Sequence, residues 1–218
     1  MKRTLGFALA FLGVVPLAAQ TDIGAQLAGR VPATVIQATQ SLAESAAVTG
    51  VPVAPLVQKA LEGAAKNVPA DRVVVALQAL FTREVTALGA LQQGGIAAPD
   101  PMAVDGATFA LSAGLSSGDV SAIARAGGTT YAPSITMRVA GTLAALGVPA
   151  AGTVRLVSVA LASGVSPGDL GSFPGSVESA LARGMTPAQA AAGLARATEA
   201  RGGVPPSQGR PAGRPHAP

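Results

Sequence analysis

Cysteine and tryptophan are absent from this chain of 218 residues, and tyrosine and histidine occur once each. Without cysteine there is no disulfide framework, no thiolate nucleophile, no cysteine-ligated metal site and no lipidated cysteine of the kind a bacterial lipoprotein needs. The one histidine, His216, leaves little scope for histidine-based acid–base chemistry or metal ligation. We therefore expect no bound metal and no cofactor.

Aromatic and charged residues are also scarce, at 3% and 12% of the chain, and the formal net charge at pH 7 is +4. Residues 20–200 hold ten basic and eleven acidic side chains, a net of −1. The remaining positive charges are Lys2, Arg3, Arg201, Arg210 and Arg214. Because this body has no basic cluster and few aromatic side chains for base stacking, we expect no nucleic-acid binding.

An uncharged, mostly apolar run extends from Leu5 to Ala19, after a short basic start that contains Lys2 and Arg3. A basic start followed by such a run is typical of a secretory signal. Its fifteen residues would span about 22 Å as a helix, less than the ~30 Å hydrocarbon core of a bilayer. We predict a signal peptide over residues 1–19, cleaved after Ala19 or alternatively after Gln20, and an exported protein that is periplasmic or secreted. The alternative is a buried first helix of a cytosolic protein.

No later stretch is expected to span a membrane after signal cleavage. The most apolar one, Val139–Ala162, is interrupted by several glycines, Pro149 and Arg155.

Apolar residues recur at helical spacing through the body of the chain. The pattern predicts helices over Val53–Ala64, Pro69–Gln92, Ile135–Leu146 and Ala150–Ala162, the last of them central because it is apolar nearly all round. The stripe of the second helix comprises Val73, Leu77, Leu80, Leu88 and Leu91, widened by Phe81 and Val85. No segment alternates convincingly with a period of two. We predict an all-α fold, a compact array of short helical hairpins (an irregular bundle or solenoid-like), forming one domain over residues 20–200.

A short punctuation pattern separates these helices: glycine, an apolar residue, then serine, threonine or proline. It occurs at Gly50, Gly114, Gly147, Gly164 and Gly184, and more loosely at Asn67 and Gly95. Glycine or asparagine fits the left-handed residue after a helix, and the apolar residue packs back on that helix. Ser116 with Asp119, Ser166 with Asp169, and Thr186 with Gln189 have the spacing of capping boxes that start the next helices.

The chain changes character after this body. From Arg201 it is rich in proline, glycine and arginine and has no apolar period, so we predict a disordered tail over residues 201–218.

Two segments match the G-x-S-x-G pattern of a hydrolase nucleophile elbow, with Ser116 and Ser166 in the nucleophile position. That motif requires a preceding strand and a histidine partner, whereas a predicted helix precedes each match and His216 lies in the predicted tail. We interpret both serines as helix N-caps.

Carboxylates are the other catalytic option. Glu62, Asp71 and Glu84 each have lysine or arginine nearby in sequence, which favours solvated helix faces. Asp100, before Pro101, is typical of a helix start, and Asp105 stands close to it. The Gly/Ser loop over residues 171–176 could present N–H groups to an anion, but a capped turn is our interpretation. We assign no catalytic, cofactor-binding or metal-binding residue.

The run Gly50–Lys66, GVPVAPLVQKALEGAAK, resembles a segment of uncharacterised exported bacterial all-helical proteins. The resemblance implies kinship and export, and it carries no activity and no functional residues with it.

The leading hypothesis is a non-catalytic exported helical protein, an interaction or structural component that acts on protein partners through its surface. The alternative is a binder of an apolar ligand or lipid between helices, which would show an apolar pocket of several hundred Å3. The second alternative is an unrecognised enzyme, with convergent polar groups and shifted pKa values in a cleft.

Overall fold

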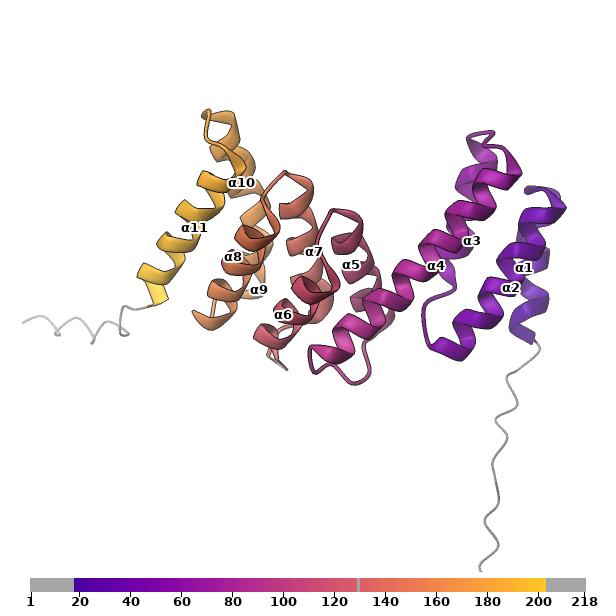
Figure 1. Cartoon of the computed structure of the whole chain (residues 1–218), viewed down its shortest axis with the longest axis horizontal. Coiled ribbons are helices and arrows are strands. Elements are labelled where there is room, and N and C mark those ends of the chain that lie inside the picture. The colour runs from indigo at the N-terminus through magenta and orange to yellow at the C-terminus, as the bar shows by residue number, and fades with distance from the viewer. Residues whose placement is uncertain (1–17, 129, 203–218) are drawn as a thin grey trace, which may run out of the picture. The chain divides into compact units, whose positions relative to one another are not determined.

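The computed structural model describes residues 18–128 and 130–202, and every regular element within these ranges is an α-helix (Figure 1). The all-α prediction is therefore confirmed. Residues 1–17 of the predicted signal peptide (1–19) and residues 203–218 of the predicted tail (201–218) lie outside the described residues. The helices are α1 (Ala18–Leu27), α2 (Ala33–Thr49), α3 (Ala54–Ala65), α4 (Ala70–Gln93), α5 (Pro101–Ser112), α6 (Ser117–Gly127), α7 (Pro133–Ala145), α8 (Ala150–Ala162), α9 (Pro167–Gly171), α10 (Phe173–Ala182) and α11 (Pro187–Gly202).

The four helices predicted from apolar spacing correspond to α3, α4, α7 and α8, with ends that differ by at most two residues. Helix α8 packs against α6, α7 and α11, which confirms its central position. Helix α11 continues through Gly202, so the predicted start of the tail at Arg201 falls within its last turn.

The punctuation pattern forms the helix ends as predicted. Gly50, Gly95, Gly114, Gly147, Gly164 and Gly184 all have φ between 69° and 104°, and Asn67 has φ of 51°. In each turn the N–H of the following apolar residue donates to a carbonyl five residues back, as Leu115 does to Ala110 at 3.1 Å. This is the Schellman arrangement, which satisfies carbonyls left open at a helix end. Gly29 and Gly128 also have positive φ and were not predicted.

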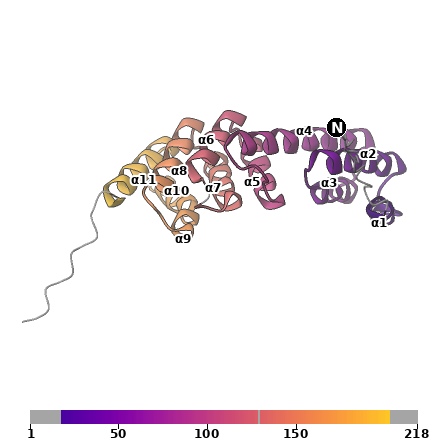
Figure 2. The same ribbon diagram turned by 90° about the horizontal axis from the view of Figure 1, so that it is seen from below.

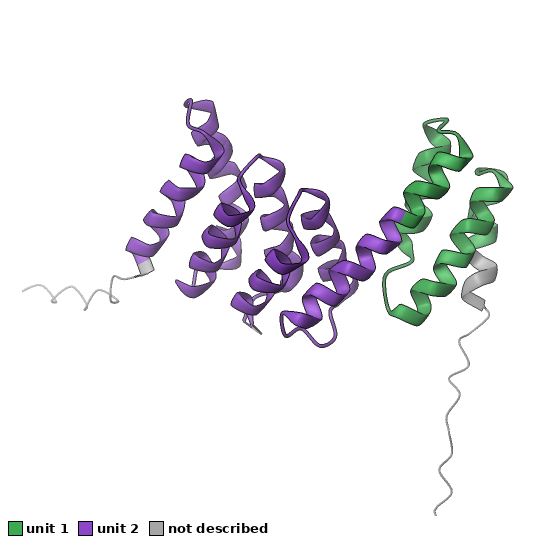
Figure 3. Ribbon diagram, viewed as in Figure 1, with its two compact units in different colours: residues 1–78 green, residues 79–218 purple. Residues whose placement is uncertain are grey.

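Contacts divide the chain into two compact units, residues up to Gln78 and residues from Ala79 onward (Figure 3). The boundary falls inside α4, which is continuous through it. The single domain predicted over residues 20–200 stays a prediction, because the two units form one domain only if they unfold together.

The first unit contains α1, α2, α3 and the beginning of α4, with contacts of α1 and α3 to α2 and to each other. Leu27, Val35, Leu56 and Leu77 are fully buried in it. A Cβ at Gly63 of α3 would lie 2.6 Å from the Val73 side chain on α4, so this glycine allows the two helices to approach closely.

The second unit arranges its helices in two rows (Figures 1 and 2). Helix α7 contacts α5, α9 and α10 in one row, and α8 contacts α6 and α11 in the other. Gly141 of α7 lies against the ring of Phe109 and the backbone of Ala110 on α5, and Gly106 of α5 lies against Ser134 and Met137 on α7. These glycines let α5 and α7 pack closely, whereas a Cβ built at Gly89 of α4 would meet no atom of another element within 4 Å.

Helix α4, with 24 residues and a mean hydropathy of 1.4 over its most apolar window, is long and apolar enough to cross a membrane. No such helix was expected here. Of that window 28% is buried in the structure, and Ala87, Ala90 and Leu91 of α4 are buried in the core of the second unit.

Candidate functional site

The two serines of the nucleophile-elbow pattern lie at junctions between helices, and no strand occurs in the described ranges. The Asp119 N–H donates to Ser116 Oγ at 3.2 Å, and the Ser116 N–H donates to Asp119 Oδ2 at 2.9 Å. Ser166 Oγ accepts from the Asp169 N–H at 3.1 Å. The predicted N-caps are confirmed, and His216 lies outside the described residues.

The helix starts predicted at Thr186 and Asp100 are also capped. Thr186 and Gln189 form a reciprocal box, with distances of 3.3 Å and 3.0 Å. Asp100 Oδ1 accepts from the Ala103 N–H at 2.8 Å and starts α5. The predicted Gly/Ser loop over residues 171–176 is mostly helical, since α9 ends at Gly171 and α10 begins at Phe173, with Ser172 alone between them. The Ser172 hydroxyl donates to the Asp169 carbonyl at 2.6 Å and does not cap α10, so the interpretation of this segment as a capped turn is wrong.

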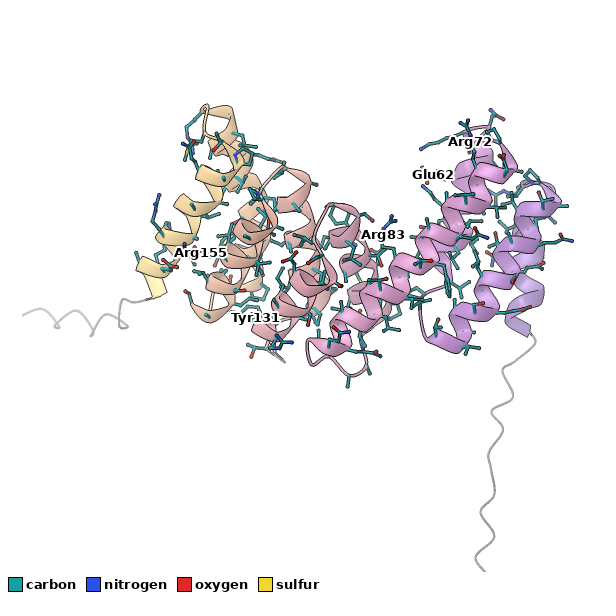
Figure 4. The ribbon with its side chains drawn as sticks, viewed as in Figure 1. Glu62, Arg72, Arg83, Tyr131 and Arg155 are labelled. Atoms are coloured by element: carbon teal, nitrogen blue, oxygen red, sulfur yellow. The ribbon has the colours of Figure 1, made fainter. Side chains whose placement is uncertain are left out.

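Glu62 lies on a solvated face of the first unit, as predicted (Figure 4). Its carboxylate accepts from Lys66 Nζ at 2.5 Å and from Lys59 Nζ at 3.0 Å. The hydrogen bonds from these two ammonium groups, and their charges, lower the pKa of Glu62 to about 2. Asp71 is exposed as well. Neither carboxylate has the buried position of a catalytic acid.

The prediction of a solvated face is wrong for Glu84. This residue of α4 is only 1% exposed, and its Oε2 atom has no hydrogen-bond partner. Burial, and secondarily the charge of Asp105, raise the pKa of Glu84 to about 7. At pH 7 a carboxyl group with this pKa is protonated in about half of the molecules.

A signal for this burial exists in the sequence. Glu84 lies seven residues after Leu77 and seven before Leu91, and both leucines are fully buried. Two helical turns separate positions seven apart, so all three share one face. The predicted apolar stripe included Val85 instead of Glu84, but the Val85 side chain is 36% exposed in the structure.

Glu84 belongs to a chain of charged groups that leads to the surface of the second unit. Asp105 on α5 repels it electrostatically, and Asp105 Oδ2 accepts from Arg138 Nη2 on α7 at 2.7 Å. The Asp105 and Arg138 side chains are 50% and 58% exposed. Thr108, one turn after Asp105, carries the other buried side-chain atom without a partner in the described part of the chain, its Oγ1.

Arg138 also lines an open groove of about 520 Å3 along the row formed by α5, α7, α9 and α10. Its other lining residues are Met102, Ser134, Ile135, Val139, Thr142, Gly171 and Pro174. Met102 is 66% exposed and Ile135 40% exposed, and Phe109 on the neighbouring stretch of α5 is 37% exposed. Apolar side chains with an ion pair at their edge suit recognition of another molecule better than covalent chemistry.

Within residues 18–128 and 130–202, no group of three or more histidine, cysteine or acidic side chains is placed to hold a metal ion. The groove contains hydroxyl groups and one guanidinium but no described pairing of a nucleophile with a base. The groove therefore presents apolar contact area with the charged Arg138 side chain at its edge.

No family model matches this chain, and comparison with curated proteins and with solved structures finds no significant match. Function therefore has to be argued from the groove and its neighbouring charges.

Proposed function

We propose that this chain is a non-catalytic exported helical protein that binds a protein partner through the groove on the α5–α7–α10 row. The observation that carries the proposal is the exposure of Met102 and Ile135 on opposite helices of one apolar groove. Fully burying one such side chain contributes roughly 1.5–3 kcal/mol, so the two together can anchor a partner.

The form of the groove favours a helical segment as the bound element. Helices α5 and α7 lie in one row, so their exposed side chains present a ridge and a groove of the kind into which an amphipathic helix packs. Arg138 and Asp105 stand at its edge and supply one charge of each sign. Such edge charges favour correct orientation more than affinity.

Export is the second part of the proposal. It is supported by the basic start and uncharged run of residues 2–19 and by the resemblance of residues 50–66 to exported bacterial helical proteins. The run over residues 50–66 includes α3.

The test places a photo-crosslinking amino acid at position 135 in the native exported protein. We expect a discrete crosslinked partner that disappears when Met102→Glu is added, because a carboxylate in the groove opposes burial of an apolar face. Met185→Glu is the matched control, since Met185 is 38% exposed but lies in the turn before α11. Equal crosslinking in both variants, or none in the parent protein, would count against the groove as the binding surface.

A further inference from the structure

A second pocket lies in the first unit, where the turn from α1 to α2 meets the turn from α3 to α4. It has a volume of about 360 Å3. Val35, Ala60 and Val73 form its apolar wall, and Arg30, Asn67 and Val68 come from the two turns. This volume is at the small end of the range for ligand pockets, and the combination of an apolar wall with few polar groups is typical of them.

The turn from α3 to α4 departs from the other turns in the residue at its left-handed position. Asn67 is the one residue other than glycine with positive φ in the described ranges, at 51°. Glycine adopts this conformation without steric penalty, so the asparagine places an amide at the pocket at some conformational cost. Val68 is 37% exposed, like Met185 in the equivalent position of the turn before α11, which is 38% exposed, whereas Val51, Leu115 and Val148 are 5%, 4% and 3% exposed.

Arg30 supplies the charge at this pocket. It is exposed, and its guanidinium makes no ion pair or hydrogen bond to another described side chain. A guanidinium presents donors in a planar fork that matches a carboxylate. The site thus combines an anion-binding group and an amide at its edge with an apolar interior.

We propose that this pocket binds a medium-chain carboxylic acid, with the carboxylate on Arg30 and Asn67 and the acyl chain along Val35, Ala60 and Val73. The apolar wall selects the chain, and the single unpaired cation selects an anionic head over a neutral one. The volume accommodates one short chain rather than a folded peptide segment. This binding activity is independent of the groove on the second unit.

The experiment is calorimetric titration of the full chain with octanoate, decanoate and dodecanoate, and with dodecanol as the uncharged probe. We expect one site, and an affinity that rises by about fourfold for each added methylene until the pocket is filled. Dodecanol should bind at least about tenfold more weakly than dodecanoate, because it lacks the charge that the Arg30 guanidinium pairs with. Absence of binding, or equal binding of the two twelve-carbon probes, overturns the proposal.

Two pairs of variants locate the site. Ala64 lines the pocket and is half-buried, so Ala64→Leu fills it and should abolish dodecanoate binding, whereas Ala65→Leu on the exposed face should not. Arg30→Gln should weaken dodecanoate at least about tenfold and leave dodecanol unchanged, and Arg196→Gln on α11 is its control. If Ala64→Leu lowers helicity, Val68→Ser is used in its place and should weaken every chain length. If dodecanoate binding is unchanged in both Ala64→Leu and Val68→Ser, the assignment of the ligand to this pocket is refuted.

Discussion

Replacing the buried carboxyl group of Glu84 by the amide, Glu84→Gln, should remove most of the pH dependence of stability that this residue imposes. The pKa of Glu84 is raised from 4.5 to about 7 in the folded protein, first by burial and then by Asp105. Between these two values the folded state keeps a proton that the unfolded state releases, so the free energy of unfolding falls as pH rises. Above about pH 7 the loss is complete and the curve levels.

The size of the effect follows from the two pKa values. The interval from 4.5 to about 7, at ~1.36 kcal/mol per pH unit, corresponds to about 3 kcal/mol. Glutamine has nearly the same shape and no charge at any pH, so this contribution disappears in Glu84→Gln. The variant should therefore gain stability relative to the parent at about pH 8 and not at about pH 4.

The assay is urea unfolding followed by far-ultraviolet circular dichroism over a series of pH values. Glu178→Gln is the matched control, because Glu178 is an exposed carboxylate on α10 of the same unit. The difference between Glu84→Gln and the control isolates the contribution of the buried carboxyl group to the pH dependence of stability. Parallel pH curves for the parent and Glu84→Gln would refute the conclusion that burial holds this carboxyl neutral.

Three further predictions follow from the helix ends and the chain termini. Ser116→Ala and Thr186→Ala should each cost about 1 kcal/mol in urea unfolding, as loss of an N-cap does, and neither Ser116 nor Ser166 should react with a fluorophosphonate probe in the folded protein. Mass spectrometry of the exported protein should show a chain that starts at Gln20 or Thr21, and an intact Met1 in a cytosolic fraction would contradict the signal peptide. Deletion of residues 204–218 should leave the thermal midpoint within about a degree, because changes away from packed features are typically within ~0.5 kcal/mol, and a large drop would show that the tail is packed on the protein.

The helix ends could be predicted from the sequence because their causes are local. A Schellman turn and a capping box each involve residues within about six positions, so Gly164 followed by Val165, Ser166 and Asp169 contains nearly all the information needed. Gly29 and Gly128 have positive φ but were not predicted, because the apolar residue that follows glycine in the pattern is missing after each of them.

The candidate sites could not be predicted in the same way, because they depend on residues far apart in the chain. Met102 and Ile135 line one groove only because Gly106 and Gly141 let α5 and α7 approach closely. The pocket proposed to bind a carboxylic acid likewise needs Arg30 and Asn67, from two different turns, at the same end of the first unit. Helical periodicity gives the faces of each helix, but it does not say which neighbour covers them.

The burial of Glu84 depends both on its position on the helix face and on packing by residues distant in the sequence. An isolated helix with this sequence would place Glu84 in water, and packing in the folded protein buries it to 1% exposure. A leucine at this position would complete the stripe from Leu77 to Leu91 without the cost of holding a carboxyl group in the interior. The acidic residue is coupled electrostatically to Asp105, and Asp105 holds the Arg138 side chain at the edge of the groove. Ionisation of Glu84 therefore changes the electrostatic balance around the ion pair that borders the proposed partner-binding surface.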